Sequence, residues 1–215
     1  MVNTTIKLFV EGGGDRASLR SECKRGFNAF LEKAGFKGYM PRIVASGSRQ
    51  NAYNDYCMAI RNGEKAVLLV DSECPVKIPN GDLHKWNPWE HLKSRDGDGW
   101  VKPDGASNID CHLMVQVMET WFLADITAIK AHFGSGFNEG TLPKHANIEE
   151  IPKSKIEDAL KFATKATKKK AYRKGRDSFD VLSKINPAEV ISKSLWAKRF
   201  IELLTDVMRG KPTPS

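Results

Sequence analysis

The chain has 215 residues, with 34 lysines and arginines against 26 aspartates and glutamates, and a formal net charge of +8. At about 150 residues per domain, this length predicts one domain, or one domain with a substantial extension. The composition, 40% hydrophobic and 28% charged, predicts a packed globular chain, and no stretch reaches the ~18 apolar residues of a membrane-spanning helix, so we expect a cytoplasmic protein without a membrane partner.

The first third of the chain alternates between strand and helix patterns. We expect a strand over 6–11, a glycine turn and a helix over about 15–34, then a strand over 41–45 and a helix ending near 61. The next apolar run, 66–70, is typical of a strand buried on both faces of a parallel sheet. This order predicts an α/β fold, a mostly parallel sheet with flanking helices.

An insertion rich in tryptophan, residues 74–108, interrupts this pattern and contains Trp86, Trp89 and Trp100. We expect these rings to pack the insertion onto the sheet, and stacking on unpaired bases is the alternative. A strand over 111–118 and a helix over 120–133 follow.

The rest of the chain has the pattern of a helical extension. A capping box from Ser154 to Glu157 predicts a helix that continues into the lysines at 168–170, and further helices are expected from 186 and over 196–207. We therefore divide the chain into an α/β domain at 1–140, a basic helical extension at 141–209 packed on it, and a frayed tail at 210–215.

The positive charge is distributed unevenly. Residues 51–150 carry a net charge of −6, whereas residues 151–215 carry +9. This asymmetry suits a protein that holds cations at its centre and a polyanion at its edge, although a solvated basic helix face is an ordinary alternative.

Acidic side chains end three of the predicted strands. Glu11 closes the first, Asp71 and Glu73 close the third, Glu119 closes the fourth, and Asp15 follows Glu11 by one turn. Because ligands bind outside the carboxyl ends of strands in open α/β sheets, we expect these acids to meet at one edge. Without cations between them, the carboxylates would repel one another strongly.

The ligand set indicates which cation this edge would hold. The four cysteines and five histidines show no zinc spacing, so zinc chemistry is excluded and the cysteines are expected to be reduced thiols. Carboxylate oxygens favour Mg²⁺ or Mn²⁺, and two such ions would suit phosphodiester cleavage. Taken singly, an acid at a strand end is more often a helix cap or a surface charge.

A second interpretation of the glycine turn is dinucleotide binding, because Gly12, Gly14 and Ala17 match the loose pattern G-x-G-x-x-A. Asp15 would lie against the pyrophosphate, and no acid ends the second strand to bind the ribose. These two features disfavour that interpretation, and the absence of Gly-Lys-Ser/Thr excludes a P-loop.

Two motifs resemble the toprim pattern of a strand-end glutamate followed by a D-x-D pair. They are FVEGGGD at 9–15 and VDSE at 70–73, in which Glu73 replaces the second aspartate. Over residues 6–200 the chain is similar to an uncharacterised toprim-like family of bacterial proteins. Its further landmarks are Gly47-Ser48-Arg49, Ala52-Tyr53, Trp89, Arg95-Asp96-Gly97, Met114-Val115-Gln116, Met118-Glu119-Thr120-Trp121, Leu142-Pro143, Ile151-Pro152-Lys153, Tyr172, Lys174-Gly175 and Ser178-Phe179.

The resemblance implies a toprim-like fold and, with it, nuclease activity on DNA or RNA. Glu11 would be the general acid/base or first metal ligand, Asp71 and Glu73 the main ligands, and Asp15 an additional ligand. Glu119 is added from its position alone. The resemblance also implies an AAA or ABC-type ATPase as partner in anti-phage defence.

Basic residues of the extension are candidates for phosphate contacts. Lys174 is best placed to offset transition-state charge, followed by Arg176 and then Arg49 near the second helix. Backbone phosphates would be contacted by Lys168, Lys169, Lys170 and Arg173. A solvated helix end is the alternative for each of these residues.

The sequence therefore predicts a Mg²⁺-dependent toprim-like nuclease. Two alternatives stay open: a non-catalytic partner or regulator of an ATPase, and an enzyme that acts on a small nucleotide. The choice of DNA or RNA, the strandedness and the oligomeric state, monomer or homodimer, also stay open.

Overall fold

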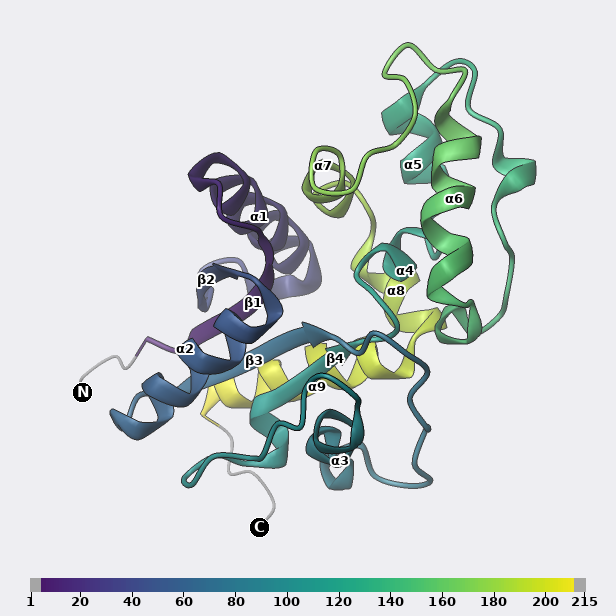
Figure 1. Cartoon of the computed structure of the whole chain (residues 1–215). Helices are drawn as coiled ribbons and strands as arrows, with labels where there is room; N and C mark the ends of the chain where they lie inside the picture. The colour runs from purple at the N-terminus through teal and green to yellow at the C-terminus, as the bar shows by residue number, and fades with distance from the viewer. Residues whose placement is uncertain (1–4, 211–215) are drawn as a thin grey trace.

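The structure, a computed structural model, describes residues 5–210 and is built around a parallel sheet (Figure 1). The strands lie in the order β2-β1-β3-β4, and every pair of neighbours is parallel. Their bounds are Lys7–Gly13 for β1, Arg42–Gly47 for β2, Ala66–Asp71 for β3 and Cys111–Met114 for β4. The predicted α/β class, a parallel sheet with flanking helices, is confirmed.

The two faces of the sheet carry separate apolar cores, because side chains alternate along each strand. On one face, Leu8 and Leu69 pack with side chains of α1 (Ala17–Leu31). On the other, Phe9 and Leu68 pack with side chains of α2 (Arg49–Arg61) and of the insertion. The continuous apolar run of β3 is thus buried on both faces, as its sequence predicted.

The insertion contains α3 (Pro88–Ser94) and two short 3-10 turns, η2 (Leu83–Lys85) and η3 (Asn108–Asp110). Trp86, Trp89 and Trp100 are buried, and Trp100 stacks on Tyr53 of α2 with ring centroids 4.5 Å apart. The rings therefore pack the insertion onto the sheet and are not exposed for stacking on bases.

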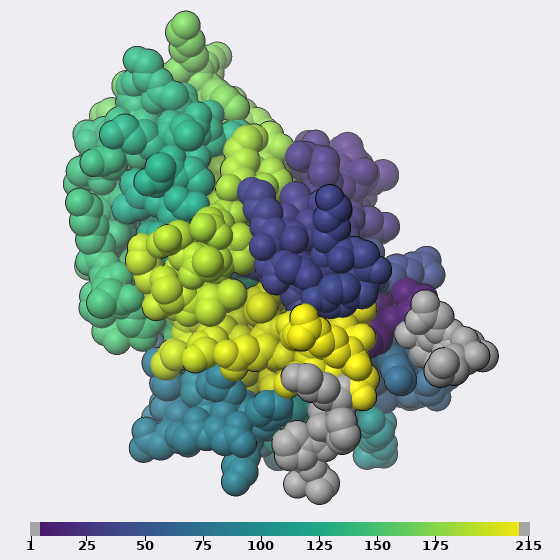
Figure 2. Space-filling model, turned by 180° about the vertical axis from the view of Figure 1, so that it is seen from behind, coloured from purple at the N-terminus to yellow at the C-terminus, as the bar shows by residue number. Residues whose placement is uncertain are grey.

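A single buried guanidinium joins the insertion, β4 and α9 (Leu195–Arg209). Arg199 is fully buried and donates hydrogen bonds to five acceptors, the carbonyl oxygens of Leu83, Trp86, Asn108 and Cys111 and Nδ1 of His112. Burial lowers the pKa of Arg199 to about 10, so it stays charged at neutral pH. Figure 2 shows α9, in yellow, between the blue insertion and the green helical segment.

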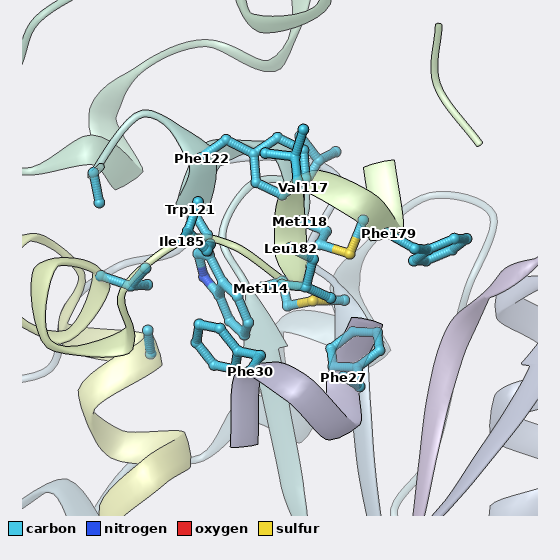
Figure 3. Close-up of a cluster of buried hydrophobic side chains, with 14 of the residues drawn as sticks. Phe27, Phe30, Met114, Val117, Met118, Trp121, Phe122, Phe179, Leu182 and Ile185 are labelled. Atoms are coloured by element: carbon cyan, nitrogen blue, oxygen red, sulfur yellow. The ribbon is translucent and has the colours of Figure 1, made fainter. Parts of the chain in front are cut away.

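The remaining helices form a lobe beside the sheet (Figure 1). They are α4 (Glu119–Phe122), α5 (Ile126–Phe133), α6 (Lys153–Thr164), α7 (Ser178–Leu182) and α8 (Pro187–Lys193), with short turns η4 (Glu139–Thr141) and η5 (Ile148–Glu150). Figure 3 shows Trp121 of α4 against Phe30 of α1, with ring centroids 5.2 Å apart. One buried cluster thus includes side chains from both the α/β segment and the helical extension.

Several boundaries in the first half of the chain differ from the prediction. β1 extends through Gly13, because Gly12 and Gly13 pair with Gly47 of β2. α1 begins at Ala17 and passes at its end into a π-helical turn, η1 (Glu32–Phe36), in which Gly35 has a φ of 98°. β2 likewise extends to Gly47.

The segment after β3 also departs from the prediction. β4 ends at Met114, and the helix expected over 120–133 is divided in two, because the side chain of Asp125 caps a new helix by accepting from Ala128 N. The described residues contain no helix with both the length and the apolar character needed to span a bilayer.

The capping box predicted at Ser154 is wrong, because the N-cap of α6 is Pro152, two residues earlier, and it has no side-chain cap. The helix also ends at Thr164, whose hydroxyl accepts a hydrogen bond from Tyr172 N at 2.7 Å. The lysines at 168–170 therefore follow the helix instead of continuing it. Of the predicted tail, only Gly210 lies within the described residues.

Candidate metal centre

Three carboxylates meet at the carboxyl ends of β1 and β3. One oxygen from each of Glu11, Asp71 and Glu73 lies within 4.8 Å of the others. β1 and β3 are parallel neighbours with Val10 opposite Leu69, so the acids that follow these positions are brought side by side. The structure thus places together three of the five predicted acids, and we call them the carboxylate group.

Backbone amides orient this group. Oδ1 of the buried Asp71 accepts from Met118 N at 2.8 Å, and Asp71 N donates to Glu11 Oε2 at 3.2 Å. Glu73 adopts a left-handed backbone with a φ of 67°, and its N–H donates to Gln116 O at 2.8 Å. A non-glycine residue is rarely held in this conformation, and such residues cluster at functional sites.

The electrostatics of the group fit a divalent cation. Burial raises the pKa of Asp71 well above its ordinary value, and the nearby Glu11 and Glu119 raise it further. Burial also raises the pKa of Glu11, although Arg49 opposes this shift. Both directions report negative charge that the protein compensates only in part. An all-oxygen donor set in this condition fits Mg²⁺ or Mn²⁺.

Arg49 contacts the carboxylate group and is held in place by residues of the insertion. Its guanidinium donates to Asp98 at 3.0 Å from Nε and 2.6 Å from Nη2, and it lies over the Trp100 ring, 4.6 Å from the centroid. Nη1 donates to the carbonyl oxygen of Asp71 and lies 3.5 Å from Glu11 Oε2. The side chain is only 13% exposed, and its guanidinium is already bound within the protein. The geometry therefore does not favour the predicted contact between Arg49 and a polymer phosphate.

Asp98 is expected to control how strongly Arg49 competes with a cation. Although burial raises the pKa of Asp98, Arg49 and Arg95 hold it below its ordinary value. In Asp98→Asn the carboxylate that holds Arg49 loses its charge, and we expect the guanidinium to turn towards Glu11 and compete with the cation. The Mn²⁺ affinity should then fall by about 10- to 100-fold, as for other changes to residues that hold a site without binding its metal. Calorimetric titration measures this, with Asp96→Asn as the exposed control; equal affinity in both variants would contradict the role.

Two lysines of the helical extension also reach the site. Lys153 Nζ forms an ion pair with Glu73, and Lys174 Nζ lies 3.6 Å from Glu119 Oε2. Burial lowers the pKa of Lys174, but Glu119 and the carboxylate group raise it, and the net pKa is above its ordinary value. Lys174, which we predicted to offset transition-state charge, is therefore a charged ammonium beside the site.

Glu119 lies next to the carboxylate group but outside it. Its Oε1 accepts hydrogen bonds from Tyr172 Oη and Ser178 Oγ, both at 3.0 Å. Its Oε2 is buried without a hydrogen-bond partner. Glu119 therefore has one oxygen engaged and one directed towards Lys174, and its role as a metal ligand stays a prediction.

Asp15 is not brought to the group. Its side chain is exposed on the turn before α1, and within the described residues the metal-competent group contains Glu11, Asp71 and Glu73. The additional-ligand role expected for Asp15 thus stays a prediction that this geometry does not support.

The predicted phosphate-binding lysines at 168–170 lie at some distance from the site, whereas Arg173 and Arg176 flank Lys174, which lies beside Glu119. Lys168, Lys169, Lys170 and Arg173 are exposed, at or beyond the turn that follows α6 (Figure 1). Because α6 has 12 residues and rises ~1.5 Å per residue, this turn is roughly one helix length from Lys153. Arg176 is bound at 2.7 and 2.6 Å by the two carboxylate oxygens of Asp177.

Sequence reasoning missed four residues that complete the site, namely Lys153, Asp98, Tyr172 and Ser178. Three of them lie in landmark segments of the toprim-like resemblance, and Asp98 follows another. The family resemblance pointed to these segments. It could not show which acids they contact, because partners up to 80 residues apart, such as Lys153 and Glu73, meet only in the folded chain.

A family model described as a domain of unknown function (DUF4276) matches residues 10–205. No curated protein and no solved structure matches the chain.

Proposed function

This chain belongs to the family described as a domain of unknown function (DUF4276), and we propose that it hydrolyses phosphodiester bonds in DNA or RNA with Mg²⁺ or Mn²⁺. The observation that carries the proposal is the carboxylate group, in which three ligand atoms lie within 4.8 Å of one another at the ends of parallel strands. The resemblance of the motifs at 9–15 and 70–73 to the toprim pattern supports the choice of reaction, and defence against phage is the setting we propose for it.

The side chains present have distinct tasks in this reaction. Glu11, Asp71 and Glu73 would hold the cation, which supplies positive charge to a phosphoryl oxygen when bound. Lys174 offsets the negative charge that develops on the phosphate. Arg49 lies 3.5 Å from Glu11 Oε2 and keeps this carboxylate in place.

Glu11→Gln tests the proposal, because it keeps the shape of the side chain and removes its charge. We expect loss of Mn²⁺ binding in calorimetry and a fall in oligonucleotide cleavage of at least about 100-fold, the contribution typical of a general acid or base. Glu32→Gln, an exposed change on η1, is the control. Cleavage by Glu11→Gln at the rate of the control would show that the nuclease proposal is wrong.

A second candidate function is a non-catalytic partner or regulator of an AAA or ABC-type ATPase. One observation favours it: Arg49 and Lys153 lie against Glu11 and Glu73, so two of the three carboxylates are already compensated. In this function the exposed basic residues after α6 would contact the ATPase. The unchanged protein would then bind no Mn²⁺, and Glu11→Gln would leave a phage-restriction phenotype intact.

Lys153→Met separates these two functions. If Lys153 competes with a cation for Glu73, its removal should tighten Mn²⁺ binding about two- to fivefold, since a partly exposed ion pair contributes ~0.2–1 kcal/mol. Lys155→Met, an exposed change on the same helix, should leave the affinity unchanged. Calorimetry that detects no Mn²⁺ binding by either variant would support the non-catalytic function.

A further inference from the structure

A cavity of about 310 Å³ opens beside the carboxylate group. Its walls come from the glycine turn of β1, the start of α1, the end of β4 and the start of α7, and Glu11 and Asp71 are part of its lining. This volume is at the lower end of the ~300–1,000 Å³ of small-molecule sites. The cavity therefore has room for a group of about one nucleotide, but not for a double helix.

One wall of the cavity is apolar. It is formed by Leu19, Met114, Met118 and Phe179. Figure 3 shows Phe179 as a member of the same buried cluster as Met114 and Met118, and a Cβ added at Gly12 would lie 3.0 Å from its Cζ. Gly14, where an added Cβ would meet nothing within 4 Å, leaves its backbone open beside this wall. Apolar side chains next to open backbone suit a nucleobase, which has apolar faces and a hydrogen-bonding edge.

The opposite end of the cavity is charged and leads to a second cavity. Glu119 and Lys174 line both, and the second, of about 260 Å³, is also lined by Lys153 and Lys161. Acidic Glu157 and Asp158 lie in the second cavity too, and Lys161 pairs with both of them. Lys153 and Lys174 are thus the cations that a phosphate would meet between the two cavities.

From this arrangement we infer that the first cavity receives the base of one unpaired nucleotide of a single-stranded nucleic acid, with its phosphate between the carboxylate group and Lys174. The inference rests on the proposed function. A base within a duplex is paired and stacked, and it could enter a cavity only after it is flipped out of the helix. A single strand needs no such step, so the site selects unpaired nucleic acid.

Binding of labelled oligonucleotides in Mn²⁺ tests this inference without depending on cleavage. An intact single strand should bind at least about tenfold more tightly than its own duplex or than a strand in which the bases are replaced by abasic positions, because base contacts of this kind are strong. Leu19→Trp fills the cavity from the partly exposed start of α1, and it should remove this preference while Mn²⁺ affinity is unchanged. DNA and RNA versions of each strand show which sugar is accepted.

Two further variants keep the test decisive. Met58→Trp adds the same ring on exposed α2, away from this cavity, and should behave as the unchanged protein. Gly14→Asn adds a side chain where a Cβ meets nothing within 4 Å and φ is +48°, so it should reproduce Leu19→Trp if that variant fails to fold.

The outcomes distinguish the two levels of the proposal. Equal binding of duplex, abasic and intact strands would overturn the inference, as would filling variants that keep the preference for intact strands. If these variants impair only the turnover of free mononucleotides, the cavity binds a small nucleotide, and the inference that it receives a base of a single strand is wrong. Absence of Mn²⁺ binding would instead overturn the proposed function.

Discussion

Asp71→Asn is expected to abolish Mn²⁺ binding and cleavage while making the metal-free protein more stable. The buried carboxylate is a proposed ligand, so cleavage should fall by at least about 100-fold. Burial, Glu11 and Glu119 raise the pKa of Asp71, so its ionised form opposes folding above that pKa, and stability rises as the pH falls through it. Removing the charge should raise the free energy of unfolding near neutral pH by about 1 kcal/mol.

Thermal unfolding in a chelator and in Mn²⁺ measures both effects of Asp71→Asn. The unchanged protein should melt at a higher temperature when Mn²⁺ is added, because the cation binds the folded state, and the variant should lose this increase. Asp104→Asn, an exposed change in the insertion, should keep it. A variant that melts earlier in chelator and still responds to Mn²⁺ would contradict the account of the carboxylate group.

Arg199→Met is expected to have the largest effect on stability. The change removes five hydrogen bonds from a fully buried guanidinium that joins the insertion, β4 and α9. Breaking a buried charged network costs ~3–5 kcal/mol, which for a chain of 215 residues lowers the melting temperature by about 10 °C.

Lys198→Met is the matched control for Arg199→Met. Lys198 precedes Arg199 on α9 and pairs with Glu202 one turn away, an arrangement worth ~0.2–0.5 kcal/mol. Equal melting temperatures for the two variants would show that the buried network does not hold the insertion in place.

The carboxylate group could be predicted from local patterns. Glu11 and Asp71 follow apolar runs that become adjacent parallel strands, and strand ends of one parallel sheet lie at one edge. The pattern could not show that Glu73 is aimed by a left-handed backbone, or that the exposed turn before α1 leaves Asp15 outside the group. Those outcomes depend on the path of the chain after each strand.

The partners of the acids could not be predicted, because they come from distant segments. Asp98 and Trp100 of the insertion hold Arg49, and Lys153 reaches Glu73 from the start of α6. Sequence patterns report which face of an element is apolar, but they do not report which charges meet once the elements pack. The insertion and the extension supply these contacts, and no hydrophobic periodicity in either segment indicates them.

The central claim is that the carboxylate group binds a divalent cation. A crystal soaked in Mn²⁺ and measured at a wavelength where manganese scatters anomalously tests this claim most directly. The account predicts an anomalous peak between Glu11, Asp71 and Glu73, with Lys153 displaced from Glu73. A saturated crystal that shows no peak there, with Arg49 and Lys153 still paired to the acids, would contradict it.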